Sequence, residues 1–183
     1  EFVWVLDPID GTRSFISGVP LWGTLIGLKR NGRPAYGMMH QPYIGERFYG
    51  DGGKAHCRNH AGERRLLTRP CASLADATVM TTTPALFPKG ERERYDSVEN
   101  QARLARYGAD CYAYCMLAAG HVDCVIETGL KPYDIVALIP IIEGAGGVVT
   151  SWDGGSAAGG GQVVASGDPR LHETVLALLA GKG

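Results

Sequence analysis

The first third of the chain carries short apolar runs separated by turn residues, a pattern that predicts an antiparallel meander of strands. The opening run, residues 2–6, is continuously apolar and indicates a buried, central strand. A strand predicted at residues 22–29 is followed by Asn31-Gly32, a strong signal for a two-residue hairpin turn. Shorter strands complete the meander, at residues 35–41, 47–49 and 54–58.

From about residue 77 the pattern changes, and predicted strands alternate with predicted helices. Gly120 should end one helix, as a C-terminal glycine commonly does. Pro132 suits the first turn of another helix, whereas Pro140 should kink or shorten it. The predicted elements are a strand at 77–83, helices at 91–106 and 111–119, a strand at 122–127, a helix at 132–143, strands near 148 and 163, and an amphipathic helix at 169–179. This alternation predicts an α/β layer with helices on both faces of a sheet.

Length and charge fit a compact enzyme and argue against other classes. The 183 residues make one domain or two small ones, and we expect a division into residues 1–72 and 73–183. A formal net charge of −1 gives no electrostatic case for binding nucleic acid or an anionic membrane. No apolar stretch is long enough to span a bilayer, and no secretory signal opens the chain.

The cysteines indicate a reducing compartment. They are odd in number and lack C-x-x-C spacing. Cys111 and Cys115 share a helical face, but a zinc site would need further soft ligands nearby. We therefore interpret the thiols as structural and reduced, which predicts a cytoplasmic protein.

The string Asp7-Pro8-Ile9-Asp10-Gly11-Thr12 follows the first strand and carries the main candidate chemistry. Two carboxylates three residues apart can face one pocket if the chain turns between them, and Pro8 and Gly11 favour such a turn. Carboxylate oxygens suit Mg²⁺, and the Thr12 hydroxyl with the backbone N–H groups of Gly11 and Thr12 could hold a phosphate. A lone D-x-x-D would more simply be an acidic turn, but the full string favours the metal.

A second motif runs from Glu127 through Asp134 into the Gly-rich stretch Glu143-Gly144-Ala145-Gly146-Gly147. Alone, Asp134 would be an acidic residue in a helix's first turn, where the helix dipole favours it. Together, in this order, the two motifs resemble those of the inositol monophosphatase family of Mg²⁺-dependent phosphatases. The resemblance spans almost the whole chain. It implies a layered αβαβα sandwich (α/β, or α+β layered) and a homodimer.

The resemblance also implies roles for single residues. Asp7 and the backbone carbonyl of Ile9 would bind one Mg²⁺, and Asp10 and Asp134 a second, with Asp7 bridging. Two such ions can activate a water and stabilise an in-line phosphoryl displacement without a covalent intermediate. Thr12 is the nearest hydroxyl to orient that water. An aspartyl-phosphate route is disfavoured, because D-x-x-D is one residue longer than the D-x-D of phosphatases that use one.

Other residues attract weaker expectations. The five histidines are scattered along the chain, so we expect none of them to act as a metal ligand or base. Arg13 follows the phosphate-binding turn and could contact phosphate, but a solvated arginine is the simpler interpretation.

By resemblance, residues 107–112 match the family's substrate loop, with Gly108, Ala109 and Asp110 at the substrate. Asp110, with Glu127 across the pocket, would suit a cationic alcohol, because charged hydrogen bonds are stronger than neutral ones. Asp110 capping the following helix is the alternative, and both roles could coexist. The implied substrate-binding set is Gly11, Thr12, Gly108, Ala109, Asp110, Glu127 and Asp134.

A finer resemblance, at Gly129-Leu130-Lys131-Pro132-Tyr133-Asp134, is to the histidinol-phosphate phosphatase branch of the family. Most inositol phosphatases have Trp where Tyr133 stands and lack the Lys-Pro pair. Histidinol phosphate carries an amine and an imidazole, so we expect its hydrolysis to histidinol and phosphate, a step of histidine biosynthesis. The alternatives are an inositol or other sugar-alcohol phosphatase and a non-catalytic folded or dimerising module.

The chain opens at Glu1 without an initiating Met. Family members carry a preceding segment with two helices and a Glu-Glu motif that supplies a first-metal ligand. We therefore expect an N-terminally incomplete chain, and activity of this polypeptide would depend on that segment.

Overall fold

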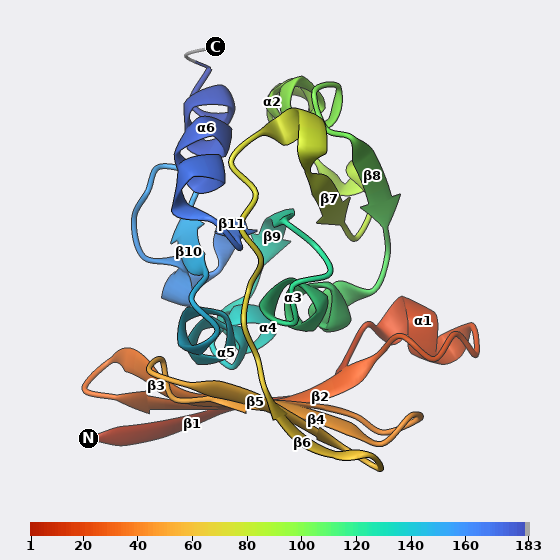
Figure 1. Ribbon diagram of the computed structural model, residues 1–183, viewed down its shortest axis with the longest axis vertical. Helices are drawn as coiled ribbons and strands as arrows, with labels where there is room; N and C mark the ends of the chain where they lie inside the picture. Colours follow the sequence, from red (N-terminus) through yellow and green to blue (C-terminus); the bar gives the residue numbers. More distant parts are fainter. Residues whose placement is uncertain (182–183) are drawn as a thin grey trace.

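The computed structural model describes residues 1–181, which stack into two sheets and two layers of helices (Figure 1). The first sheet is antiparallel, with its six strands in chain order. A short helix, α1 (Thr12–Ile16), follows the first strand and precedes the second along the chain. The strands are β1 (Phe2–Asp10), β2 (Gly23–Arg30), β3 (Arg33–Gln41), β4 (Glu46–Gly50), β5 (Ala55–Asn59) and β6 (Gly62–Arg65).

The second sheet is mixed, with the strand order β10-β11-β9-β7-β8. Strand β7 pairs in parallel with both β8 and β9, whereas β11 pairs antiparallel with β9 and β10. Helical connections separate the parallel strands, as parallel pairing requires. The strands are β7 (Thr78–Thr81), β8 (Leu104–Tyr107), β9 (Cys124–Leu130), β10 (Val148–Ser151) and β11 (Gly161–Ser166).

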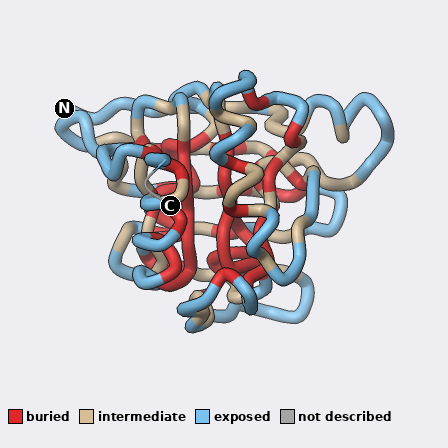
Figure 2. Tube along the Cα trace, turned by 90° about the horizontal axis from the view of Figure 1, so that it is seen from above, coloured by how far each residue is buried: buried red, intermediate tan, exposed pale blue. Residues whose placement is uncertain are grey.

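One helical layer, α3 (Asp110–Ala118), α4 (Pro132–Ile135) and α5 (Leu138–Gly144), lies between the sheets, and α2 (Lys89–Glu99) and α6 (Pro169–Leu179) cover the far face of the second sheet (Figure 1). Strand β9 alternates between the two resulting cores: Val125 faces the middle helices, and Ile126 faces α2 and α6. Figure 2 shows the buried segments gathered inside, with the N-terminus at an exposed edge. Three single-turn 3₁₀ helices complete the structure, η1 (Leu74–Asp76), η2 (Pro84–Leu86) and η3 (Ala157–Gly159).

A row of glycines lets the middle helices approach the first sheet closely. Gly27, Gly37 and Gly50 lie directly opposite one another on β2, β3 and β4. A Cβ atom built on Gly37 would stand 1.7 Å from the carbonyl oxygen of Ala137, and one on Gly50 would stand 2.6 Å from that of Pro140. The backbone from Ala137 into α5 therefore lies in a groove that only glycine leaves open.

Most predicted elements are confirmed. The hairpin at Asn31-Gly32 has positive φ at both residues, as a type I′ turn requires. The layered α/β class, the antiparallel meander and the helices on both faces of one sheet are present, and α6 has the predicted bounds. In the described residues, no helix is long and apolar enough to cross a membrane.

Four predictions need correction. The helix predicted at 91–106 ends at Glu99, and Leu104–Tyr107 instead forms an edge strand paired with β7. No glycine or proline marks the end of this helix in the sequence, so the prediction ran too far. Pairing with β7 is what makes the later residues a strand. The helix predicted at 132–143 is two helices, and Pro140 lies in the first turn of α5, where its missing N–H costs nothing. Strand β6 was not predicted at all.

The fourth correction concerns the opening strand. The apolar run at residues 2–6 was expected to be central and buried, but within residues 1–181 β1 pairs with β2 alone and lies at the edge of the first sheet. The side chains of Phe2, Trp4 and Leu6 are 65%, 61% and 57% exposed. The division at residue 72 stays a prediction; one hydrophobic core contains residues from both sides of it.

Replacing Gly37 with alanine tests the glycine groove. A methyl group there overlaps the backbone of Ala137, so Gly37→Ala should lower the free energy of unfolding by about 3 kcal/mol, the upper end for overpacking. Gly90→Ala in α2 is the control, since nothing lies within 4 Å of its Cβ position, and it should be neutral or stabilising by up to about 1 kcal/mol. Urea denaturation measures both, and equal effects would contradict the groove.

His172 makes the stability pH-dependent. It is buried, its Nε2 lies 2.9 Å from Thr150 Oγ1, and its Nδ1 lies 3.1 Å from Ser166 Oγ. Burial lowers the pKa of His172 to about 4 from an ordinary value of 6.5. As the pH falls, the imidazole of His172 is therefore protonated at a higher pH in the unfolded chain than in the folded one. The cost is absent above pH 6.5 and grows as the pH falls from 6.5 to 4.

We expect acidification from pH 7.5 to 5 to cost roughly 2 kcal/mol of unfolding free energy through His172. His172→Gln should remove that part of the pH dependence, whereas the exposed His121→Gln should retain it. Denaturant titrations at the two pH values measure this, and parallel pH profiles for both variants would refute the assignment.

Candidate active site

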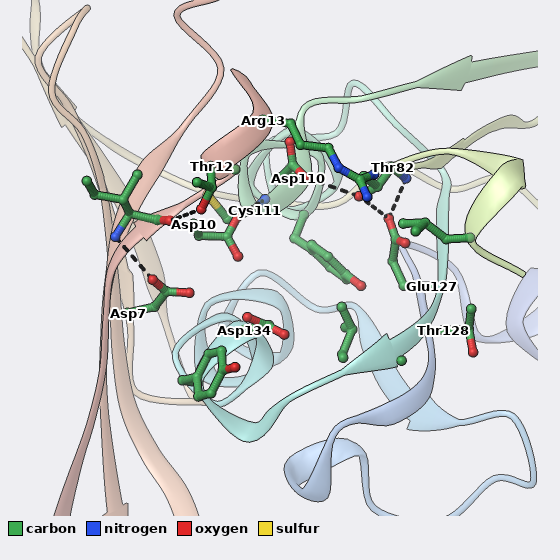
Figure 3. A pocket seen from close by; sticks show the side chains of 17 residues that line it. Asp7, Asp10, Thr12, Arg13, Thr82, Asp110, Cys111, Glu127, Thr128 and Asp134 are labelled. Atoms are coloured by element: carbon green, nitrogen blue, oxygen red, sulfur yellow. Dashed lines mark hydrogen bonds between the residues drawn. The ribbon is translucent and has the colours of Figure 1, made fainter. Parts of the chain in front are cut away.

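A cavity of about 520 Å³ opens where the end of β1, the start of α3, the end of β9 and α4 meet (Figure 3). Its walls come from both sheets and from the helices between them. The lining residues include all three carboxylates expected to bind metal. The functional candidates on its wall are Asp7, Ile9, Asp10, Gly11, Thr12, Asp110, Glu127 and Asp134.

A bulge at the end of β1 brings the first two carboxylates to one side. The register with β2 shifts between Asp7 and Asp10, which removes the strict alternation of a strand. The backbone N–H of Ile9 donates to Asp7 Oδ1 at 3.1 Å, and the Thr12 hydroxyl donates to the Ile9 carbonyl at 3.1 Å. Gly11 then turns the chain with a φ of 81°. The turn that was expected to bring Asp7 and Asp10 to one pocket is therefore present.

Asp134 reaches the same place from the start of α4. The N–H of Lys131 donates to Asp134 Oδ2 at 2.6 Å, which fixes the carboxylate at the helix start. Each of Asp7, Asp10 and Asp134 offers an oxygen, and these atoms all lie within 4.8 Å of one another. Residues far apart in the sequence thus form one carboxylate cluster, the carboxylate trio.

Backbone N–H groups orient every member of the trio. Asp7 accepts from Ile9, Asp134 accepts from Lys131, and Asp10 Oδ1 accepts from the N–H of Cys111 at 2.9 Å. In each case one oxygen is held by the backbone, and the other oxygen has no backbone partner among the described residues. Such outer hydrogen bonds are how proteins orient metal-ligating carboxylates.

The electrostatics of the trio call for a cation. Burial raises the pKa of Asp10 to about 7, and the charges of Asp110 and Asp7 add to the shift. Burial and then Asp7 also raise the pKa of Asp134. None of the ion pairs within residues 1–181 involves the trio. Three crowded carboxylates with oxygen ligands only are a donor set that fits a hard divalent ion such as Mg²⁺.

Asp110 enters the cavity from a strained turn. Gly108, Ala109 and Asp110 have φ values of 85°, 75° and 43°, a left-handed run that costs the two non-glycine residues about 1–2 kcal/mol each. Strain of this kind is concentrated at functional sites. The capping alternative is wrong, because the Asp110 carboxylate accepts no backbone N–H from the first turn of α3, where the Cys111 N–H donates to Asp10 instead. Asp110 instead lines the cavity, while Gly108 and Ala109 shape the turn and do not line it.

Glu127 lies opposite, almost fully buried on β9. Its carboxylate accepts from the Thr82 N–H at 2.6 Å, the Thr82 hydroxyl at 2.9 Å and the Thr81 hydroxyl at 3.3 Å. Burial raises the pKa of Glu127 to about 7 against these lowering contacts. Thr82 Oγ1 also lies 3.4 Å from Asp110 Oδ1, so it stands between the two acids. Sequence reasoning missed Thr82, although its polar position at the end of a predicted strand was a usable signal.

Arg13 was expected to be solvated. It is exposed but lines the cavity, and in Figure 3 its guanidinium extends toward Asp110 and Thr82. Burial raises the pKa of Asp110, and hydrogen bonding from Thr82 and the charge of Arg13 oppose that shift. No histidine among the described residues lines the cavity, and sequence reasoning overlooked Tyr114, Leu86 and Leu130, which do.

Comparisons with known proteins agree with this geometry. A sequence model described as "Inositol monophosphatase family" matches residues 1–182. The chain is 45% identical to "Bifunctional phosphatase IMPL2, chloroplastic" of Arabidopsis thaliana, over 96% of the chain and 53% of that protein. It is 34% identical to "Histidinol-phosphatase" of Mycobacterium tuberculosis, over 96% of the chain and 68% of that protein.

A solved inositol monophosphatase from Zymomonas mobilis superposes with a TM-score of 0.92 at 41% identity, covering 98% of this chain and 70% of that one. The chain therefore spans about half the length of the plant relative and about two thirds of the bacterial ones.

Substitutions in the trio test the cation site. Asp10→Asn keeps the acceptor for the Cys111 N–H but removes a charge, so it should weaken Mg²⁺ binding by about tenfold or more in titration calorimetry. It should also raise the metal-free melting temperature, because the ionised form is costly beside the other carboxylates. Asp153→Asn, in an exposed turn, is the control. Unchanged Mg²⁺ affinity in Asp10→Asn would exclude this site.

Proposed function

The chain belongs to the inositol monophosphatase family, and from that premise we propose that the protein hydrolyses histidinol phosphate to histidinol and inorganic phosphate with Mg²⁺. The observation that carries this choice is Asp110, a carboxylate held in the cavity by a strained turn and facing Glu127. Such a pair favours an alcohol with a positive charge.

The metal would be held by the carboxylate trio together with the carbonyl oxygen of Ile9. When bound, Mg²⁺ supplies Lewis acidity that makes a water more nucleophilic and offsets the negative charge of the phosphate. The backbone contacts that orient Asp7, Asp10 and Asp134 would keep this site open to the substrate. Thr12, hydrogen-bonded to Ile9, would stand beside the phosphate with its hydroxyl and its N–H.

Each end of the cavity suits one end of the substrate. The phosphate belongs at the trio, where the cation compensates its charge. The alcohol then extends toward Asp110 and Glu127. These ends are close, because the N–H of Cys111, the residue that follows Asp110, donates to Asp10 Oδ1 at 2.9 Å, so a small ester can reach both.

Charge favours an amino alcohol over a polyol. Asp110 and Glu127 lie on either side of Thr82, and Arg13 is the only basic residue that lines the cavity within residues 1–181. An ammonium group would gain charge-assisted hydrogen bonds there, whereas a neutral polyol would leave Asp110 without a cationic ligand. The similarity to a histidinol-phosphatase supports this choice, and the similarity to an inositol monophosphatase supports a sugar-alcohol phosphate as the second candidate.

Location and assembly remain part of the proposal. The five cysteines are free, which fits a reducing compartment such as the cytoplasm. A homodimer rests on the family resemblance alone.

Substrate choice is tested by comparing two esters. The wild-type protein, as the complete gene product with Mg²⁺, should release phosphate from histidinol phosphate faster than from inositol 1-phosphate, judged by kcat/KM. Equal rates, or a preference for inositol phosphate, would overturn the proposal.

Asp110→Asn isolates the charge, because asparagine tolerates the positive φ of that position. This variant should lose about tenfold to a hundredfold of its kcat/KM for histidinol phosphate and keep its rate on inositol 1-phosphate, since only the cationic alcohol loses a charged partner. Asp153→Asn controls for a general effect of charge. If Asp110→Asn slows both esters alike, Asp110 does not select the alcohol.

A further inference from the structure

Tyr114 has a buried hydroxyl without a partner. Its side chain is 3% exposed, and its Oη is the one buried side-chain polar atom in residues 1–181 that lacks a hydrogen bond. The residue also lines the cavity of the candidate active site. Leaving such a group unpaired is costly, and a phenylalanine would fill the same space without that cost. The hydroxyl therefore needs a purpose that packing does not supply.

The position of Tyr114 on α3 points to the alcohol end of the cavity. It follows Asp110 by four residues, so the two side chains share one face of the helix. The negative charges of Glu127, Asp10 and Asp134 all act on its hydroxyl. Burial raises the pKa of Tyr114 well above its ordinary value, so the group is an O–H donor at any physiological pH. Because this hydroxyl donates to no group of the protein, it can donate to an acceptor atom of a bound ligand.

We propose that Tyr114 is a specificity-determining residue whose hydroxyl donates a hydrogen bond to an acceptor nitrogen on the ring of the substrate alcohol. The proposal rests on the function proposed above. Two kinds of side chain would then recognise the two polar groups of the alcohol. The acids, Asp110 and Glu127, take the ammonium, which can only donate. Tyr114 takes the unprotonated imidazole nitrogen, which can only accept.

The surroundings suit a ring at this place. Leu86 and Leu130 line the same cavity and offer apolar contact to a flat, partly apolar group. The hydroxyl is closed to bulk water in the ligand-free chain. A bound ring would reach the hydroxyl by displacing the side chains that cover it, and the new hydrogen bond would offset the cost of that movement.

The test uses two esters that differ only in the ring. Histidinol phosphate has the acceptor nitrogen, whereas phenylalaninol phosphate keeps the amine and the phosphate but has a phenyl ring. Tyr114→Phe should lower kcat/KM for histidinol phosphate by about tenfold to a hundredfold and leave phenylalaninol phosphate unchanged or improved. Rates are measured on the complete gene product with Mg²⁺.

A neighbouring tyrosine provides the control. Tyr112 lies on the same helix, but its hydroxyl already donates to Glu46 Oε2 at 2.7 Å, and it does not line the cavity. Tyr112→Phe should lower the melting temperature and leave the preference between the esters intact. Tyr114→Phe should leave the ligand-free melting temperature unchanged or raise it, because it removes an unpaired polar atom.

The outcomes separate two failures. If the wild type does not turn over histidinol phosphate, the proposed function fails. If it does, and Tyr114→Phe keeps the wild-type preference or slows both esters equally, the role of Tyr114 alone is overturned. A lower ligand-free melting temperature in Tyr114→Phe would likewise overturn it, since the hydroxyl would then have a partner within the protein.

Discussion

The close contact between the glycine row of the first sheet and the backbone that joins α4 to α5 is the constraint on which the rest of the structure depends. With Gly37 opposite Gly27 and Gly50, the carbonyl of Ala137 lies where any side chain would stand. That contact holds α4 against the first sheet, and α4 carries Asp134. The distance between Asp134 and the end of β1 is therefore set by packing between layers, because backbone contacts of this kind leave no slack.

Charge then makes the carboxylate trio a favourable place for a cation. The packing that joins the layers also crowds Asp7, Asp10 and Asp134 and buries Asp10, so its pKa rises to about 7. Their backbone hydrogen bonds prevent the carboxylates from turning away. The folded chain thus holds carboxylates whose mutual repulsion a divalent ion would relieve. This repulsion lowers the stability of the metal-free site and would raise its affinity for the ion.

Local sequence signals predicted the elements whose causes are local. Asn31-Gly32 adopts the turn that its residues prefer, and Asp168 and Pro169 begin α6 as a side-chain cap and a first-turn proline should. The failures have non-local causes. Leu104–Tyr107 is a strand because β7 offers it a parallel partner, and nothing in its own residues announces that pairing. Phe2 to Leu6 is apolar like a central strand, yet within residues 1–181 it lies at a sheet edge, because pairing order is decided between strands.

The same division holds at the site. By itself, the sequence determined the donor chemistry of two carboxylates on one turn, and the family resemblance added Asp134 as their partner and Asp110 in the substrate loop. Only the tertiary structure decided that Thr82 stands between Asp110 and Glu127, that backbone N–H groups orient each carboxylate of the trio, and that the hydroxyl of Tyr114 is left unpaired beside them. The reason is physical: residue type and spacing set what a side chain can do, whereas its partners depend on packing between segments far apart in the chain.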